Sequence, residues 1–574
     1  MKPSPQSSPR LLDRFFGLVE TARGSDRLLL RIAFFSFIGA LIWVFFSINQ
    51  QHSALTAIRG GSITEGIIGT PRFVNPALAI TRADQDVVAL IYRGLMRINS
   101  DGTLVNDLAE SITTSADGLT YSIVLKKNLQ FHDGTPLTAR DVVFTIQLIQ
   151  NPDLKSPLRG NWTDVTVEEV NEYELNVHLT DAYAPFIENF TLGVMPAHVW
   201  SNLPIEQLPF SQLNTEPIGS GPFSISAAKR DTSGIINHYS LSAFRDNEAN
   251  PKIDSLELAF FQNENTLIDA LNSGDVDSSA YVSVENVSRV NSSVFQLIEK
   301  PLPRSFGIFF NQNKSSALRD PAARKALTAA IDRDALIDKT LFGYGIPIEG
   351  PTALNQHELE SKDSTSTRQE TAIEILKKGG WGKNNNGQWE KQISGGPVTL
   401  SVTIRTSNVP LFESLSDVIV EQWEAIDVEV ITEQFEQTGL IQSVIRPRDF
   451  QALLFGLEMN RTYDLYPFWH SSQQDDPGLN IAQYTNVTVD ALLEKARIEQ
   501  DEAVRKDTLI KAGNIIRDEQ PAIFLFQPSL TYLVSKDVTV ADLTNIGRPA
   551  DRFSNIEEWH TESDSLWPMF RKDM

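Results

Sequence analysis

Histidine and acidic side chains are the groups in this sequence best suited to metal or acid–base chemistry. The eight histidines are scattered, with no HxH pair and no pair at the spacing of ligands on one helix face. His357-Glu358 begins like a zinc-binding helix, but position 361 is Ser, so the second ligand one turn later is missing. Acidic pairs such as Asp475-Asp476 are too common here to mark a catalytic dyad. The sequence therefore predicts no metal site and no cofactor.

Motifs that hold a nucleotide or present a nucleophile are also missing from the sequence. The chain has no GxSxG elbow, no GxxxxGK[ST] phosphate loop and no GxGxxG fingerprint. Gly219-Ser220-Gly221-Pro222 lacks the spacing of a dinucleotide loop, and Pro222 removes a backbone donor. The absence of Cys excludes thiol nucleophiles, disulfides and lipid attachment through a cysteine. We therefore predict that the chain is not an enzyme.

Length and charge narrow the class of protein further. The 574 residues carry 73 acidic against 50 basic side chains, a formal net charge of -23, which repels phosphate backbones and predicts no nucleic-acid partner. Hydrophobic residues at 41% and charged residues at 21% are typical of folded proteins. The chain is long enough for several domains.

The stretch Ile32 to Ile48 contains seventeen residues without a charge, enough to cross the hydrocarbon core of a membrane as a helix. Basic residues precede it, whereas the first basic residue after it is Arg59. We therefore predict a cytoplasmic segment over 1–31, a transmembrane anchor over 32–51 and an extracytoplasmic main domain. A cleaved signal peptide is the alternative, but cleavage after Ala57 would place Leu55 where a small residue is preferred.

Beyond Arg59 the sequence alternates strand-like and helix-like runs, which predicts a mixed α and β architecture. Residues 120–126 alternate like a half-buried strand, and a turn follows at 131–134. Thr138 and Asp141 have the spacing of a capping box at the start of a helix. Asp320-Pro321 predicts another helix start, and the apolar pattern after it predicts one helix that ends at Gly343.

A series of motifs in fixed order resembles a known family. They are LIYRGLMRINSDG from Leu90, FHDGTPLTARDVVF from Phe131, PIGSGPF from Pro217, DPAARKALTAAIDRDALI from Asp320 and RFSNIEEW from Arg552. From about residue 60 to 562 the chain resembles the extracytoplasmic solute-binding proteins of ABC importers, in the family of oligopeptide-, dipeptide- and nickel-binding proteins (family 5). Each motif by itself is a turn or a capped helix and identifies the fold rather than a ligand contact.

The resemblance implies an α/β, three-lobed fold like that of periplasmic binding proteins, here preceded by the transmembrane helix. Lobe I would comprise 59–96, 216–302 and 526–574, lobe II would be inserted at 97–215, and lobe III would occupy 303–525. The solute would lie between lobes I and III, which close by a hinge. The implied partners are an oligopeptide or another small solute and an ABC permease, and the implied state is a monomer tethered to the membrane by its N-terminal helix.

Peptide binders of this family hold the ligand as an added extended strand, through main-chain hydrogen bonds. Carried over by position, the lobe I edge would be the loop of Thr70, Pro71, Arg72 and Phe73. The lobe III edge would be Leu457, Glu458 and Met459. At these positions the resemblance assigns binding to the backbone.

The sequence departs from the family at the group that anchors a peptide's α-ammonium. Several relatives use an Asp three residues before an Asp-Pro pair, but here Asp464 is followed by Leu465 and Arg461 stands three residues earlier. Arg461 would repel an ammonium and could instead bind a carboxylate or phosphate, with Glu458 as the nearest alternative anion. A metal complex, a sugar or an anion therefore remains an alternative to a peptide, as does a hydrolase on a similar scaffold.

Overall fold

The computed structural model describes residues 24–52, 54–245, 250–352, 354, 365–393, 395–544, 546–561 and 563–566. The chain divides into two compact units, Met1–Arg59 with Glu562–Met574, and Gly60–Thr561. Most of the predicted cytoplasmic segment, residues 1–23, lies outside the described residues.

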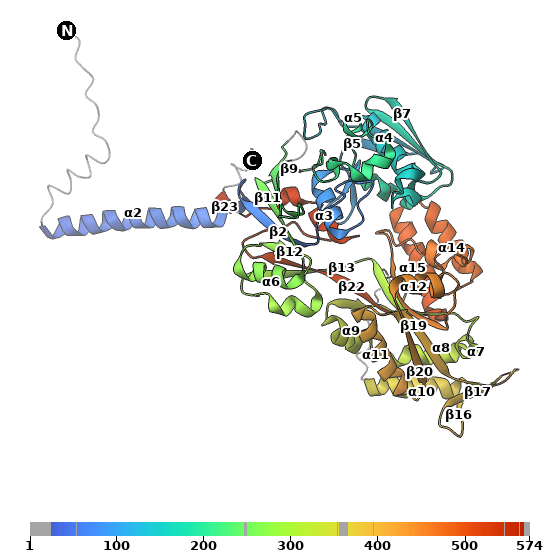
Figure 1. The fold of residues 1–574 in the computed structure, drawn as a ribbon. Coiled ribbons are helices and arrows are strands. Elements are labelled where there is room, and N and C mark those ends of the chain that lie inside the picture. The colour runs from blue at the N-terminus through green and yellow to red at the C-terminus, as the bar shows by residue number, and fades with distance from the viewer. Residues whose placement is uncertain are drawn as a thin grey trace, which may run out of the picture. The chain divides into compact units, whose positions relative to one another are not determined.

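The smaller unit contains one long helix and a short ribbon (Figure 1). Helix α2 (Gly24–His52) includes the predicted span 32–51, and its apolar part Leu28–Ser47 is long enough to cross a membrane. Strand β1 (Ala54–Ala57) pairs antiparallel with β23 (Ser563–Leu566). By length and composition α2 fits either a membrane anchor or a signal sequence.

The larger unit is built on a twelve-stranded mixed sheet in the order β20-β19-β21-β14-β22-β12-β2-β11-β10-β9, with β13 and β15 also paired to β22. Helices and strands of this unit confirm the predicted mixed α/β fold. The strands are β2 (Ser62–Ile68), β9 (Phe223–Arg230), β10 (Ile236–Ala243), β11 (Ser255–Phe261), β12 (Ser278–Ser279), β13 (Phe295–Pro301), β14 (Arg304–Phe310), β15 (Gly345–Pro347), β19 (Ser401–Ser407), β20 (Glu429–Phe435), β21 (Ala452–Glu458) and β22 (Ala522–Ser535).

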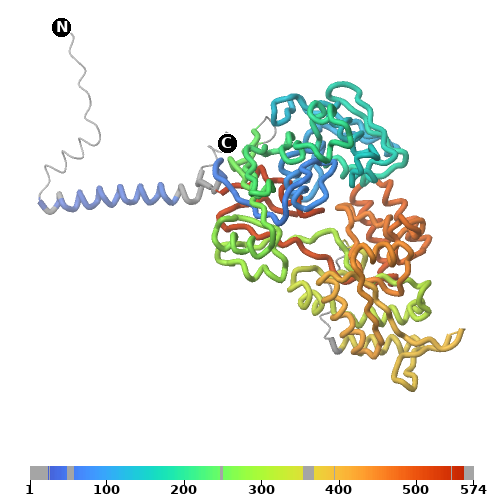
Figure 2. Tube along the Cα trace, in the orientation of Figure 1, coloured from blue at the N-terminus to red at the C-terminus, as the bar shows by residue number. Residues whose placement is uncertain are grey.

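Strand β22 joins the two halves of this sheet. Its second half pairs with β12 and β13, and its first half pairs with β14 and β15. Pro528 lies near the middle of the strand, at the change of partners, where it has no N–H to donate. Figure 2 shows residues from the beginning of this unit (blue) running beside the red C-terminal part.

Both faces of the half formed by β14, β19, β21 and β22 are buried. Ile308 and Phe310 of β14 enter one apolar cluster, whereas Phe309 between them enters another, as the two-residue period of a strand requires. The first cluster is covered by α7 (Ser316–Arg319), α8 (Pro321–Ala330), α9 (Arg333–Leu341), α10 (Thr365–Lys378) and α11 (Pro410–Glu424); the second by α12 (Gln437–Leu440), α13 (Tyr466–Trp469), α14 (Val487–Ile498) and α15 (Glu502–Glu519).

The other half of the large sheet shares its core with a smaller sheet of four strands. Its strands are β5 (Ala109–Thr114), β6 (Thr120–Leu125), β7 (Val165–Asn171) and β8 (Glu174–Leu179), in the order β5-β6-β8-β7. Helix α4 (Ala139–Gln150) begins at the predicted capping box, where Thr138 N–H donates to Asp141 (2.9 Å).

Other elements of the larger unit are α3 (Arg82–Ile91), β3 (Met96–Ile98), β4 (Leu104–Asn106), η3 (Ala184–Thr191), α5 (Ala197–Trp200), α6 (Glu264–Ser273) and η10 (Pro549–Phe553). A separate ribbon is formed by β16 (Gly382–Lys383), β17 (Trp389–Ile393) and β18 (Gly396–Thr399).

The helix predicted from Pro321 to Gly343 is two helices, so that part of the prediction is wrong. Helix α8 ends at Ala330 and α9 begins at Arg333. Between them Asp332 caps α9 through Ala335 N–H, and its own N–H donates to the Gln422 side chain (3.0 Å). A contact from α11, distant in sequence, therefore stabilises a break that the apolar pattern does not reveal.

Candidate functional site

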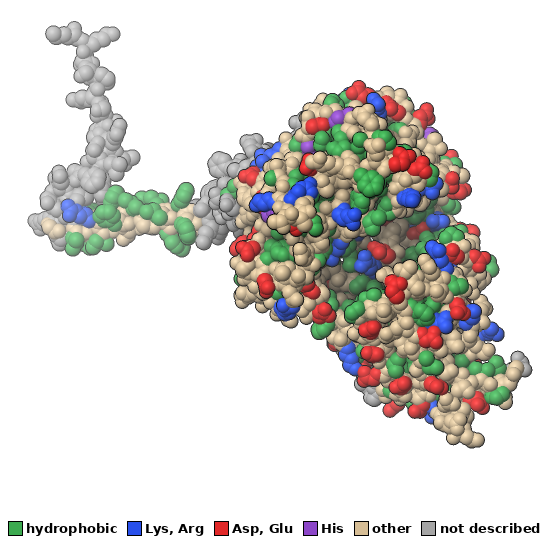
Figure 3. Space-filling view, viewed as in Figure 1, with side chains coloured by type: hydrophobic (Ala, Val, Ile, Leu, Met, Phe, Trp, Pro, Cys, Tyr) green, Lys and Arg blue, Asp and Glu red, His purple; other side chains and the backbone are tan. Residues whose placement is uncertain are grey.

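A cavity of about 680 Å³ lies in the larger unit, between the segment that carries η3 and the segments that follow β21 and precede η10. Figure 3 shows a hollow on this face with acidic and basic side chains around it. The charged residues lining the cavity are Asp164, Asp181, Glu188, Glu458, Arg461, Arg497, Arg548 and Asp551. Its size is that of a small-molecule or short-peptide site.

Arg461 lines this cavity, but its guanidinium is already engaged. It donates to the carboxylate of Asp551 (2.5 Å), which also accepts the backbone N–H groups of Gly547 and Arg548. Both partners are largely shielded from water, and the two arginines at 461 and 548 hold the pKa of Asp551 below its usual value despite burial. The positive charge that the sequence places here is therefore balanced within the protein.

Asp464 is buried and fully engaged. It accepts a hydrogen bond from the Tyr183 hydroxyl (3.1 Å) and one from Arg497 Nε (3.2 Å). The Arg497 guanidinium also stacks between the rings of Tyr183 and Tyr466. Burial and the Asp464 carboxylate both raise the pKa of the Tyr183 hydroxyl, so this group stays protonated and donates. Asp464 thus connects the residue that precedes η3 to α14.

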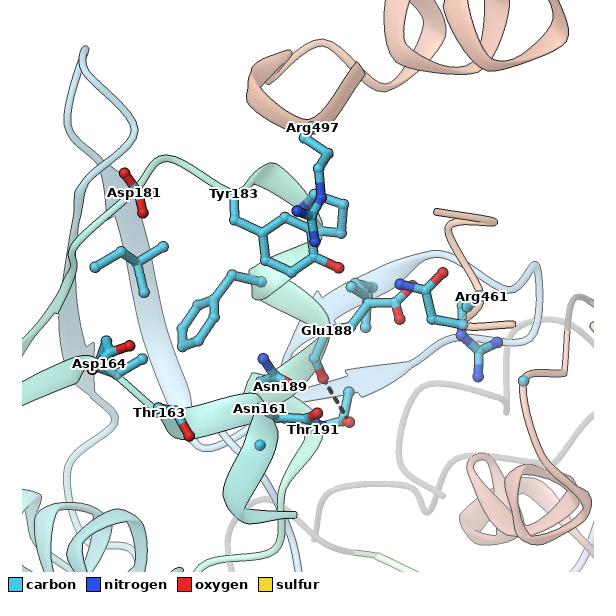
Figure 4. A pocket seen from close by; sticks show the side chains of 18 of the residues that line it. Asn161, Thr163, Asp164, Asp181, Tyr183, Glu188, Asn189, Thr191, Arg461 and Arg497 are labelled. Atoms are coloured by element: carbon cyan, nitrogen blue, oxygen red, sulfur yellow. Dashed lines mark hydrogen bonds between the residues drawn. The ribbon is translucent and has the colours of Figure 1, made fainter. Parts of the chain in front are cut away.

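Glu188 projects into the same region from η3 (Figure 4). Its Oε1 is buried and has no hydrogen-bond partner. Burial raises the pKa of the Glu188 carboxyl to about 7, although the Arg461 guanidinium and the backbone N–H of Thr462 favour the ionised form. Glu188 therefore differs from Asp464 and Asp551 in that one of its buried oxygens has no protein donor.

The backbone of β21 has one open edge at the predicted site. Strand β19 pairs with β21 only at Ala452 and Leu453, and within the described ranges no strand pairs with this edge farther along. On the opposite edge of β21, Met459 N–H donates to Pro303 O (2.8 Å). Backbone N–H and C=O groups of successive residues in a strand point to alternate edges, so those of Gly456 and Glu458 point to the open edge. The side chains of Leu457 and Met459 are buried in the core.

The predicted edge at Thr70 to Phe73 has a different environment. The N–H groups of Arg72 and Phe73 both donate to the Asp84 carboxylate, at 2.7 and 2.9 Å. Pro71 has no N–H, so the groups still available along this loop are chiefly carbonyl oxygens. Among the described residues, none of Thr70 to Phe73 lines the 680 Å³ cavity.

The structure thus brings Glu458, Arg461 and the Asp464 network together and leaves the Thr70 loop apart from this cavity. The sequence did not indicate Glu188, Tyr183 or Asp551, because each approaches from a segment far along the chain. Gly456 was missed as well, although its place two residues before Glu458 in a strand-like run was a signal for the same backbone edge. Among the described residues no group of three His, Asp or Glu side chains converges as a metal site.

Comparison with known proteins gives a consistent result. Residues 103–484 match the model of bacterial extracellular solute-binding proteins, family 5. The oligopeptide-binding protein AppA of Bacillus subtilis is 28% identical over 527 residues, which cover 89% of this chain and 93% of AppA. The glutathione-binding protein GsiB of Pectobacterium atrosepticum is 26% identical, covering 81% of this chain and 88% of the relative.

Solved structures show the same fold. The complex of Bacillus subtilis AppA with a nonapeptide has a TM-score of 0.63 at 26% identity, covering 88% of this chain and all of AppA. NikZ of Campylobacter jejuni, solved with Ni(L-His), has a TM-score of 0.63 at 23% identity, over 87% of this chain and 99% of NikZ, and supports the fold alone. The family match spans well over half of the chain, and the chain therefore belongs to family 5 of the bacterial extracellular solute-binding proteins.

Proposed function

We propose that the chain is the substrate-binding component of an ABC transporter and that it binds oligopeptides without cleaving them. The solute lies along the open edge of β21, beside the cavity, and is then delivered to a permease. Binding is reversible and non-covalent, and the protein acts as a monomer.

The observation that carries this proposal is the open edge at Gly456 and Glu458 next to a cavity of about 680 Å³. Unpaired backbone donors and acceptors bind an extended peptide as an additional strand, whatever its side chains. The relatives support the same reading, since AppA is named as an oligopeptide-binding protein and was solved with a nonapeptide.

The proposal includes a three-lobed architecture with the boundaries given by the resemblance. Lobe I would then be 59–96, 216–302 and 526–574, lobe II 97–215 and lobe III 303–525. The crossing from β13 to β14 and the middle of β22 at Pro528 would be the two connections between lobes I and III. Closure around a solute needs only that the solute binds the closed state more tightly.

The helix α2 supports a membrane tether. Its apolar part is exposed along its length, and the basic residues lie on its N-terminal side. A retained anchor would keep the receptor near its permease and raise the effective concentration of one for the other. The N-terminus would be cytoplasmic and the larger unit extracytoplasmic.

Calorimetry on the full chain in detergent micelles tests the proposal, with alanine-rich peptides of three, five and nine residues as ligands. Saturable binding with intact peptide recovered afterwards supports it. Progressive cleavage of the peptides would instead indicate a hydrolase. Binding of a nickel–histidine complex or a disaccharide, with no peptide binding, would replace the proposed solute.

A further inference from the structure

Glu188 is the acidic group of the cavity with one buried carboxylate oxygen that the protein leaves without a hydrogen-bond donor. Its Oε1 is buried from water, yet it accepts no hydrogen bond. A buried carboxylate oxygen without a donor lowers stability, and it does so more strongly when the group is charged. An arrangement with this cost points to a partner that arrives with the solute.

Asp464, Asp551 and Glu458 already have protein partners, whereas Asp164 and Asp181 of the cavity lining are exposed to water. Asp464 is held by Tyr183 and Arg497, and Asp551 by backbone N–H groups and two arginines. Glu458 is exposed and pairs with Arg304 (3.2 Å). A cationic group that paired with Asp464, Asp551 or Glu458 would have to displace an existing partner, whereas the buried Oε1 of Glu188 has none to displace.

We propose that Glu188 is the specificity-determining residue of this site and that it binds a cationic group of the solute, an ammonium or a guanidinium. The inference rests on the proposed function and names the solute class that the same cavity prefers. Figure 4 shows why the position suits this role, because Glu188 lies between Tyr183 and Arg461, on the wall of the cavity. The Arg461 guanidinium does not take the place of the solute's cation beside Glu188, because it is hydrogen-bonded to Asp551.

Titration of Glu188 gives the proposal a distinct signature. Burial raises the pKa of its carboxyl to about 7, and the Arg461 guanidinium only partly opposes this. The other charged or titratable groups around the cavity are Asp551, Arg548, Arg497, Asp464, Tyr183, Asp164, Asp181 and Glu458. The carboxyl must lose its proton to pair with a cation, so binding of a cationic solute weakens by about tenfold from pH 8 to pH 6.

The test uses hexa-alanine peptides, acetylated and amidated so that their termini carry no charge. One set carries a single lysine at each position in turn, and a matched set carries norleucine, which has a similar length and no charge. Dissociation constants are measured at pH 6, 7 and 8 for the full chain, the variant Glu188→Gln and the control variant Glu206→Gln, which is exposed on the surface.

At pH 8 we expect the native chain and Glu206→Gln to bind one lysine peptide at least about tenfold more tightly than its norleucine match. Glu188→Gln should lose this preference and its pH dependence, while it still binds the norleucine peptide, which shows that it is folded. If Glu188→Gln still prefers the lysine peptide, or if the native chain shows no such preference, the proposed role of Glu188 is refuted. The proposed function of the chain would not be affected by either result. Failure of every peptide to bind would refute the proposed function and, with it, this inference.

Discussion

Replacing the buried arginine of η10 is the sharpest test of how the larger unit is held together. The Arg552 side chain is 0% exposed and forms ion pairs with Glu65 of β2 (2.9 Å) and Asp86 of α3 (2.6 Å). Glu65 also accepts hydrogen bonds from Ser278 and Tyr532. One guanidinium therefore balances two carboxylates from elements far apart in sequence, and we predict that Arg552→Met severely destabilises this unit.

The magnitude follows from the charges left behind. Removing one partner of a buried ion pair costs about 3–5 kcal/mol, because the other partner stays buried without compensation. At 1.36 kcal/mol for each factor of ten, this lowers the ratio of folded to unfolded protein by roughly 10²- to 10⁴-fold. The matched control is Arg548→Met, since Arg548 is 52% exposed and its pair with Asp551 should contribute about 1 kcal/mol or less.

Urea unfolding in detergent micelles, followed by tryptophan fluorescence, measures both variants at pH 7 and pH 5. Burial already raises the pKa of Glu65 in the native chain, and loss of Arg552 raises it further. The folded state of Arg552→Met then binds more protons than the unfolded state, so the loss of stability should shrink as the pH falls toward 5. Equal losses for the two variants, or a loss for Arg552→Met that grows at pH 5, would refute this reasoning.

Three further predictions concern other parts of the chain. Gly219→Ala should lower stability by about 1–3 kcal/mol, because a Cβ there would collide with the backbone oxygen of Ile91; Gly439→Ala, with open space at that point, is the control in a thermal melt. Asp141→Ala should cost about 1–3 kcal/mol in the same assay, since its carboxylate accepts the N–H groups of Thr138 and Ala197, and an unchanged melting temperature would contradict this. In membrane fractionation the native chain should resist alkaline extraction and a chain without residues 24–52 should be released, whereas release of both would contradict the tether.

Local signals explain how much of the fold could be predicted from the sequence. The capping box at Thr138 and the Asp-Pro start of α8 depend only on residues that are neighbours in the sequence, and both are present in the structure. The apolar stretch from residue 32 likewise needs no tertiary context to form α2. The break after Ala330 could not be predicted, because it depends on Gln422 in another helix.

The candidate site could be predicted only in part for the same reason. Arg461 was recognisable from its place before Asp464, but its charge is balanced by Asp551, ninety residues later. Glu188 lies in a segment with no distinctive motif, and its unusual environment arises from contacts with the chain near Arg461 and Thr462. Such electrostatic relations depend on the tertiary fold and are not encoded in local spacing.

Native mass spectrometry of the full chain, released from detergent micelles directly after purification, tests the central claim most directly. Our account predicts a spread of additional masses that fragment as peptides and disappear after unfolding and refolding. A single defined non-peptide mass in place of that spread would contradict oligopeptide binding.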